Sequence, residues 1–232
     1  MRKLSVSDGA DSFDVALFEA AAPSAAVLFA VGGGGNPERH LPLLTSLHES
    51  GCTVAAPYFE RLVTPVPTEA DLLVRARRLR LALDQIAQIA QPRLPTTGVG
   101  HSIGATMLLA LAGGQAWTRD RTRLDIASEP RLQRLVLMAP ATDFFRAPGA
   151  LEAVRLPIQV WAASKDVITP PAQAEFLRQA LADRVAVDLH VVEDADHFSF
   201  VNVRPPLTTE SLPNREAFLA ELAANVIGFV AR

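Results

Sequence analysis

The fold predicted for this chain depends most on residues 97–107, which have the sequence TGVGHSIGATM. A short apolar run leads into Gly-x-Ser-x-Gly, formed by Gly100, Ser102 and Gly104, and a helix-forming segment follows at once. In a sharp turn between a strand and a helix, the central residue has a strained backbone, and the residues two before and two after it come close together, which favours glycine at both. We therefore predict a strand, a tight turn and a helix that lift the Ser102 hydroxyl clear of the backbone, as a nucleophilic serine requires.

The helix predicted after this turn has a second chemical use. Its first N–H groups are free and its dipole is positive at this end, so both face the oxygen of a carbonyl that Ser102 would attack. The backbone N–H of Ile103 is therefore one predicted donor to an oxyanion. A chance Gly-x-Ser-x-Gly in a loop is the alternative, and the strand before the motif and the helix after it argue against that alternative.

Length and composition set limits on the class of protein. The 232 residues, 49% of them hydrophobic, suffice for one core, and no linker or repeat divides them, so we expect a single domain over residues 1–232. The formal net charge of −3 gives no reason to expect a nucleic-acid partner. No stretch approaches the roughly 20 uninterrupted apolar residues that a membrane span needs.

The N-terminus and the cysteine content indicate a cytoplasmic protein. The cations Arg2 and Lys3 are not followed by the apolar segment of a secretion signal. The single cysteine, Cys52, excludes an internal disulfide and suits a reducing compartment. Because Cys52 begins an apolar, strand-like run, we interpret it as a buried structural residue and not as a reactive thiol.

Strand-like and helix-like segments alternate along the chain. A hairpin is predicted from the apolar runs at residues 4–7 and 13–18. Further strands are predicted at residues 25–31, 53–59, 97–100, 135–139, 158–163 and 185–192. Helices are predicted at residues 37–50, 68–90, 103–112, 170–182 and 214–230, and a loop with a short helix at residues 115–131. This order predicts an α/β fold with a mostly parallel sheet, an N-terminal antiparallel hairpin and helices on both faces.

Four arginines, Arg75, Arg77, Arg78 and Arg80, lie on the helix predicted at residues 68–90. A basic cluster of this kind can bind an acidic partner. On a chain that is acidic overall, a solvated helix face is the simpler interpretation, and we adopt it here.

Two more functional groups follow predicted strands. Asp166 comes just after the strand at residues 158–163, and His197 comes just after the strand at residues 185–192. In a parallel sheet, functional residues gather beyond the carboxyl ends of the strands, so both are expected near Ser102. The order Ser, Asp, His is the chain order of the α/β-hydrolase triad.

The sequence resembles the α/β-hydrolase superfamily along nearly its whole length. It is most similar to small, lidless bacterial members related to dienelactone hydrolases and platelet-activating-factor acetylhydrolases. The pieces that carry the resemblance are GHSIG at residues 100–104, the four glycines at residues 32–35, WAASKDVITP at residues 161–170 and DHFSF at residues 196–200. Dienelactone hydrolases have a cysteine where this chain has Ser102, so the resemblance does not imply lactone specificity.

The resemblance implies a catalytic triad of Ser102, His197 and Asp166. His197 would take the proton of Ser102 and return it to the leaving alcohol, and Asp166 would orient the imidazole. Other carboxylates are alternatives to Asp166: Asp143, Asp194 and Asp196. The remaining histidines are assigned no catalytic role; His101 is expected to point away from the site, His48 lies near a helix end and His190 within a strand.

A second oxyanion donor should come from the glycine loop at residues 32–35. By its position in the family pattern, Gly33 is the predicted donor, with Gly34 next. Family members often begin this loop with His-Gly, whereas this chain has Val31-Gly32 and so lacks a side chain that would brace the loop.

No cofactor or metal is expected. A dinucleotide fingerprint, Gly-x-Gly-x-x-Gly, would need a glycine where Pro37 stands. The acidic residues before His197 lack a second histidine at metal-ligand spacing.

The predicted function is that of a cofactor-free serine esterase acting on a small-molecule carboxylic ester, or a thioester, of small or medium size. The short connection at residues 140–157 leaves no room for a lid, so the site should be open. Aromatic residues that follow strand ends would line an apolar pocket: Tyr58, Phe59, Phe144, Phe145, Phe198 and Phe200. An acyltransferase or perhydrolase with the same triad and a non-catalytic binding protein are the alternatives; the oligomeric state stays open, with a homodimer as one option.

Overall fold

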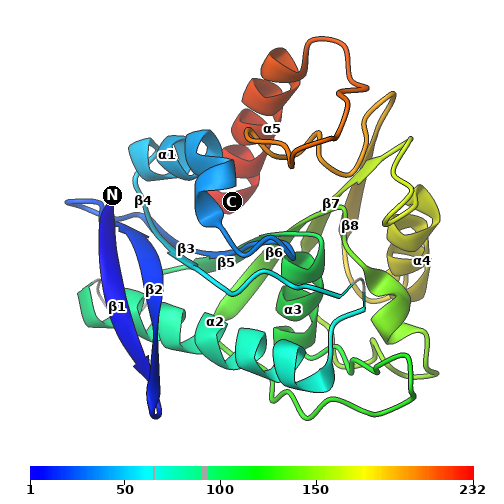
Figure 1. The fold of residues 1–232 in the computed structure, drawn as a ribbon, viewed down its shortest axis with the longest axis horizontal. Helices are drawn as coiled ribbons and strands as arrows, with labels where there is room; N and C mark the ends of the chain where they lie inside the picture. The colour runs from blue at the N-terminus through cyan, green and yellow to red at the C-terminus, as the bar shows by residue number, and fades with distance from the viewer. Residues whose placement is uncertain (65, 90–93) are drawn as a thin grey trace.

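A central eight-stranded sheet organises the computed structural model, which describes residues 1–64, 66–89 and 94–232. The strand order is β1-β2-β4-β3-β5-β6-β7-β8 (Figure 1). The strands are β1 (Arg2–Asp8), β2 (Asp11–Phe18), β3 (Ala25–Ala30), β4 (Cys52–Pro57), β5 (Thr96–His101), β6 (Leu132–Met138), β7 (Ile158–Ala163) and β8 (Val187–Val192). The pairs β1–β2 and β2–β4 are antiparallel and all others are parallel, so the predicted sheet with its N-terminal hairpin is confirmed.

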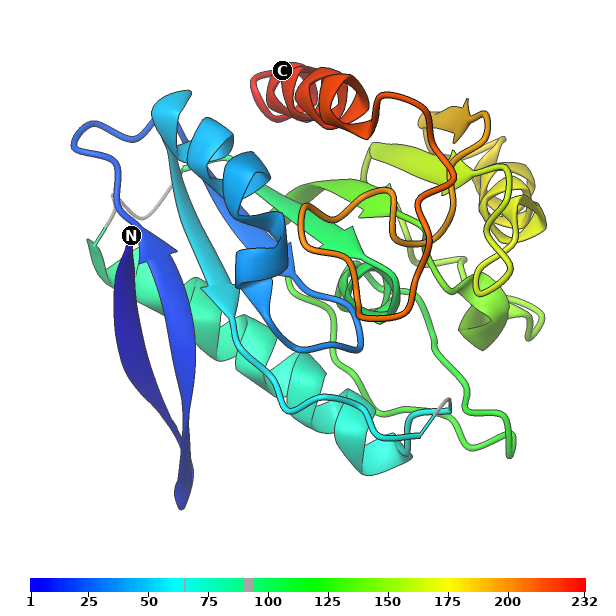
Figure 2. The same ribbon diagram turned by 45° about the horizontal axis from the view of Figure 1, so that its top comes forward.

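Helices cover both faces of this sheet, as predicted (Figures 1 and 2). On one face lie α1 (Leu41–Glu49) and α5 (Arg215–Val230). On the other lie α2 (Glu69–Ile89), α3 (Ile103–Leu111) and α4 (Pro171–Leu181). Two short 3-10 helices are η1 (Pro37–His40) and η2 (Thr142–Phe145). Ala90, the last residue of the second predicted helix, lies outside the described residues.

The inner strand β3 is a continuous apolar run because both of its faces are buried. Every residue of β3, with the sequence AAVLFA, is buried. Successive residues of this strand pack into the two hydrophobic cores on opposite faces of the sheet. Leu28 packs with α2 and α3, whereas Phe29 packs with α1 and α5. Cys52 is buried at the start of β4, and burial raises the pKa of its thiol, as expected for a structural cysteine. Within the described ranges, none of the helices combines the length and the apolar character needed to cross a bilayer.

The short helix predicted within residues 115–131 is wrong. The structure forms no helix in this segment, all of which it describes, and has only an isolated bridge between Trp117 and Arg123. The backbone N–H groups here donate to other loops instead of to carbonyls four residues earlier. Gln115 donates to the carbonyl of Ala150, and Trp117 to that of Phe144. These contacts link segments far apart in the sequence, so no local pattern indicates them.

The solvated arginine face is only partly present: Arg77 is exposed and Arg75 is buried, and all four arginines of α2 bind groups of this chain. Arg80 donates to the carbonyls of Ala127 and Ser128. Arg77 and Arg78 both bind the carboxylate of Asp8, at 2.5 and 2.8 Å. The hairpin of β1 and β2 is thereby tied to α2.

We expect Asp8→Asn to destabilise the protein in a pH-dependent manner. The hydrogen bond from Arg77 outweighs burial and lowers the pKa of the Asp8 carboxyl to about 2. A carboxyl whose pKa is lower in the folded than in the unfolded state stabilises the fold above the unfolded value, near 4, and loses that contribution as the pH falls. Because Arg77 is largely exposed, the loss at pH 7 should be only about 1–2 kcal/mol, decreasing to roughly half near pH 3.

Urea unfolding of the wild-type and Asp8→Asn proteins across this pH range measures the effect. Asp14→Asn is the control, since Asp14 lies on the same hairpin and pairs with Lys3 at the surface, where both side chains are about half exposed. Equal losses for the two variants, or a loss at Asp8 that does not change with pH, would contradict the assignment.

Candidate active site

The predicted strand, turn and helix are present at residues 96–111. Strand β5 ends at His101, α3 begins at Ile103, and Ser102 between them has φ 55° and ψ −127°. For a residue with a side chain this is a strained backbone conformation. The flanking glycines are required by close backbone contacts: a Cβ at Gly104 would lie 2.2 Å from the carbonyl oxygen of Ala30, and one at Gly100 would lie 2.9 Å from the backbone nitrogen of Ala105.

We expect Gly104→Ala to destabilise the protein by about 3 kcal/mol or more, because the atoms in the way belong to the backbone of the central sheet and cannot rotate aside. Gly228→Ala is the matched control. Gly228 lies in α5 with nothing within 4 Å of the added Cβ, so alanine should stabilise the protein by about 0.5–1 kcal/mol. Urea unfolding of both variants measures the difference, and a Gly104→Ala protein as stable as the wild type would contradict this account of the turn.

The structure brings the three residues of the predicted triad together. Asp166 lies in the turn after β7, His197 in the loop after β8, and Ser102 at the end of β5. The Oγ atom of Ser102 lies 3.0 Å from Nε2 of His197, and Nδ1 of His197 lies 2.7 Å from Oδ2 of Asp166. The side chains of His197 and Asp166 are 7% and 0% exposed. Two hydrogen bonds thus connect the hydroxyl to a buried carboxylate through one imidazole.

The Asp166 carboxylate is held as an anion by several donors. The backbone N–H groups of Ile168 and Thr169 each donate to Oδ1 at 2.8 Å, and the Thr169 hydroxyl donates to Oδ2 at 2.7 Å. Burial alone would raise the pKa of Asp166, but His197 and these donors outweigh it, so that the pKa lies below the usual carboxyl value. Thr169 is not among the site residues predicted from the sequence, although an aspartate followed three residues later by threonine is a recognisable turn pattern.

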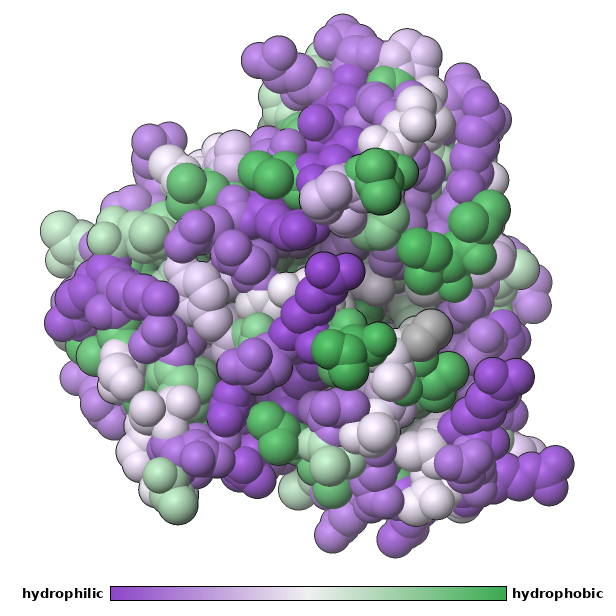
Figure 3. Space-filling model, viewed as in Figure 1, coloured by the Kyte–Doolittle hydropathy of each residue, from purple (hydrophilic) through white to green (hydrophobic). Residues whose placement is uncertain are grey.

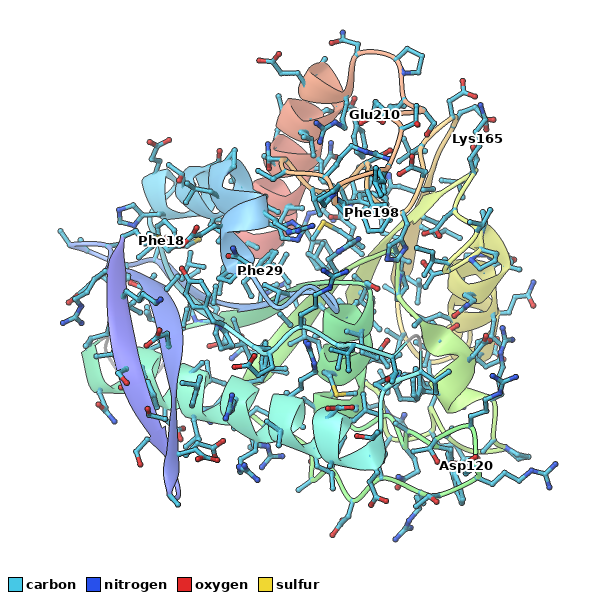
Figure 4. All side chains as sticks on the ribbon, in the orientation of Figure 1. Phe18, Phe29, Asp120, Lys165, Phe198 and Glu210 are labelled. Carbon is cyan, nitrogen blue, oxygen red and sulfur yellow. The ribbon has the colours of Figure 1, made fainter. Side chains whose placement is uncertain are left out.

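The other carboxylates considered for this role are engaged elsewhere. Their ion-pair partners are Arg146 for Asp143, Lys165 for Asp194 and Arg204 for Asp196. Arg204 also binds Glu210 at 3.2 Å, which anchors the segment that follows His197. In Figure 4, Phe198 and Glu210, both in the segment that follows β8, lie in the upper half of the picture, whereas Asp120 lies near its lower edge.

His101 is buried and does not line the pocket next to Ser102. Its Nε2 atom donates to the backbone carbonyl of His197 at 3.0 Å, and the two rings are 4.9 Å apart. Burial holds the pKa of His101 well below its ordinary value, so this ring is neutral. The side chain predicted to point away from the site therefore contacts the main chain of His197. His190 stacks on Trp161 in the β7–β8 pair, away from the candidate triad.

The glycine loop lies against Ser102. A Cβ at Gly32 would be 3.4 Å from the Cβ of Ser102, and Gly33 lines the same pocket as Ser102 and Ile103. Within the described residues, neither the N–H group of Gly33 nor that of Ile103 donates to a backbone carbonyl. Both are therefore available to a ligand.

A cavity of about 720 Å³ opens beside the Ser102 hydroxyl. Of the six aromatic residues expected here, Phe144 lines this cavity, while Phe145 and Phe200 are buried in the core. Leu62 and Trp117 line it without having been predicted, because they come from loops whose positions depend on distant contacts. The face shown in Figure 3 is hollowed near its middle and carries polar and apolar groups side by side. Residues 139–157, between β6 and β7, contain only the short helix η2 and no inserted lid.

Solved structures match the chain over nearly its whole length. Esterase 2 of Thermogutta terrifontis, phosphorylated by paraoxon, is 16% identical, with 99% of this chain and 96% of that chain aligned and a TM-score of 0.69. A serine hydrolase without a lid from Xanthomonas campestris is 17% identical, with 100% and 95% aligned and a TM-score of 0.68. A serine hydrolase homologue from Coxiella burnetii is 15% identical, with 99% and 97% aligned and a TM-score of 0.67.

The Thermogutta esterase has also been solved with propionate and with butyrate bound. No protein-family model matches the sequence, and no curated protein matches it. At identities this low the likeness concerns the fold. The chain has the α/β-hydrolase fold without a lid, as the resemblance of its sequence predicted.

Proposed function

We propose that this protein is a serine hydrolase that cleaves carboxylic esters of small or medium size through an acyl-enzyme. The observation that supports this proposal most strongly is the pair of hydrogen bonds, 3.0 and 2.7 Å long, that joins Ser102 to His197 and His197 to Asp166 at the wall of an open cavity. In this proposal Ser102 is the nucleophile, His197 the general base and acid, and Asp166 the group that orients the imidazole.

The proposed reaction has two halves. In the first, Oγ of Ser102 attacks the ester carbonyl carbon while Nε2 of His197 takes the hydroxyl proton, and the N–H groups of Ile103 and Gly33 stabilise the oxyanion. The C–O bond to the leaving alcohol then breaks, and His197 donates the proton to its oxygen. In the second half, water attacks the acyl-enzyme, His197 takes a proton from the water, and the acid leaves as Ser102 regains its proton. Asp166 stabilises the imidazolium cation in both halves.

The size of the cavity supports the proposed substrate class. A volume of about 720 Å³ falls within the range of small-molecule sites. Apolar side chains such as Leu62, Phe144 and Ile168 lie around it and suit a short acyl chain. The propionate and butyrate seen in the Thermogutta esterase are acids with short acyl chains.

A series of p-nitrophenyl esters from acetate to decanoate tests the proposal. We expect kcat/KM to be highest among the shorter acyl chains and to fall for decanoate, because polar side chains such as Thr118, Arg119 and Asp143 also line the cavity and a long acyl chain would have to contact them. The absence of turnover for every ester in the series, relative to the Ser102→Ala protein, would reject the proposed function. Analysis of the products with added methanol separates hydrolysis from acyl transfer, since a methyl ester as the main product would identify an acyltransferase.

A further inference from the structure

A buried arginine lies under the glycine loop and has no part in the mechanism above. Arg75, on α2, is 3% exposed, and its guanidinium lies 4.6 Å from the centre of the Phe59 ring. In the part of the chain that the structure describes, no carboxylate forms an ion pair with it. Burial lowers the pKa of Arg75 to about 10, although the negative charge of Asp71 favours the charged guanidinium and raises the pKa. The guanidinium therefore remains charged at neutral pH. A buried charge without an ion-pair partner is costly, so its position calls for an explanation other than stability alone.

The hydrogen bonds of Arg75 go to backbone carbonyls around the glycine loop. Nη1 donates to the carbonyls of Val31 and Gly32 at 3.5 and 3.4 Å, and Nη2 donates to that of Glu60 at 3.2 Å. The segment that contains Glu60 is itself bonded to the loop: the N–H groups of Phe59 and Leu62 donate to the carbonyls of Gly35 and Gly33, each at 2.9 Å. The Gly32 carbonyl also accepts from the N–H of Gly35 at 3.1 Å. One guanidinium therefore contacts both segments and adds to the backbone bonds that join them.

The planar peptide group links this contact to the oxyanion donor. In a trans peptide, the carbonyl of Gly32 and the N–H of Gly33 point in opposite directions. Because the Gly32 oxygen faces Arg75, the Gly33 N–H faces away from Arg75. Gly33 lines the cavity beside Ser102, whereas Arg75 is buried and does not line it. The side of the loop that faces away from Arg75 is therefore the side toward the cavity, and we infer that the Gly33 N–H points there.

We propose that Arg75 is a positioning residue that holds the loop at residues 32–35 so that the Gly33 N–H is directed at the oxyanion. The proposal rests on the proposed function, and Arg75 acts through backbone carbonyls without touching the substrate. Four consecutive glycines are costly to order, and the loop lacks a bracing side chain of its own. The planar guanidinium can bind several carbonyls at once in a fixed arrangement, which the ammonium of lysine on its flexible stem cannot reproduce.

Three variants test this role: Arg75→Met, Arg75→Lys and the matched control Arg78→Met. Loss of one oxyanion donor lowers kcat by about 10²–10³-fold, so a donor that is misaligned but still present should cost about 10–100-fold in Arg75→Met. KM for p-nitrophenyl butyrate should change by less than about threefold, because the ester itself loses no contact. A trifluoromethyl ketone, which forms an oxyanion on serine, should bind more weakly by the same factor as kcat/KM falls. Arg75→Lys, which keeps the charge, should recover part of the loss.

Arg78 lies on the same helix and binds Asp8 at 2.8 Å, so Arg78→Met should lower stability but leave kcat unchanged. Hydrogen–deuterium exchange gives a readout that does not depend on turnover. Exchange in peptides that cover residues 31–36 should become faster in both Arg75 variants and remain unchanged in Arg78→Met.

A folded Arg75→Met or Arg75→Lys protein with wild-type kcat, or an equal fall of kcat in Arg78→Met, would overturn the proposal. So would unchanged exchange of the loop. If the wild type shows no turnover that depends on Ser102, the proposed function is rejected, and exchange alone then decides whether Arg75 holds the loop.

Discussion

Replacing Ser102 by alanine is expected to lower kcat for a short p-nitrophenyl ester by about 10⁶-fold. The reason is that Oγ is the only atom of residue 102 that could form the acyl bond, and its hydrogen bond to His197, 3.0 Å long, would be lost. The remaining turnover would come from the oxyanion donors and the cavity. Steady-state kinetics of the purified variant measures the loss, and turnover near that of the wild type would contradict the role of Ser102.

A second variant separates this chemical loss from misfolding. Ser102→Gly also lacks the hydroxyl, but glycine adopts φ 55° without the strain that serine bears here. We therefore expect Ser102→Gly to be as inactive as Ser102→Ala and to be more stable than the wild type by about 1 kcal/mol, as measured by urea unfolding. An inactive protein that is also more stable cannot owe its inactivity to unfolding.

Replacing His197 by alanine is expected to cause a loss of kcat of similar size, about 10⁶-fold. Without the imidazole, the Ser102 hydroxyl loses the base whose Nε2 atom lies 3.0 Å from Oγ and would take the proton during attack. Because the two residues are proposed to act as a unit, the double variant Ser102→Ala/His197→Ala should be no slower than either single variant. The same kinetic assay measures all three proteins.

His190→Ala is the matched control for this prediction. His190 is a partly buried histidine that stacks on Trp161 and does not line the cavity, so kcat should stay at the wild-type value. A large loss in His190→Ala, or effects of Ser102→Ala and His197→Ala that multiply in the double variant, would show that the two residues do not act together.

Much of the fold could be predicted because its signals are local. The buried strand β3 is a continuous apolar run, and β6 ends in one at residues 135–138. The turn at Ser102 is marked by glycines whose replacement would cause backbone clashes. The placement of Asp166 and His197 followed from the same topology, since both come directly after parallel strands that pair with each other.

The parts that the sequence did not reveal depend on contacts between distant segments. Helical spacing places Arg75, but not Arg77, on the buried face of α2 with Leu72 and Leu79. It does not indicate that Arg75 binds the carbonyls of the glycine loop or that Arg77 binds a carboxylate of the hairpin. Trp117 reaches the cavity from a segment whose backbone bonds lead to other loops. A pattern along one helix or one loop does not contain the position of its partner, so these roles emerge only when the chain is folded.

Covalent labelling of Ser102 tests the central claim most directly. A fluorophosphonate probe reacts with a serine that is activated by a base and flanked by oxyanion donors. We expect mass mapping to find one adduct, on the peptide that contains Ser102, in the wild type, and none at this position in Ser102→Ala or His197→Ala. An unlabelled wild-type protein, or equal labelling of Ser102 when His197 is absent, would contradict the claim that Ser102, His197 and Asp166 form a working triad.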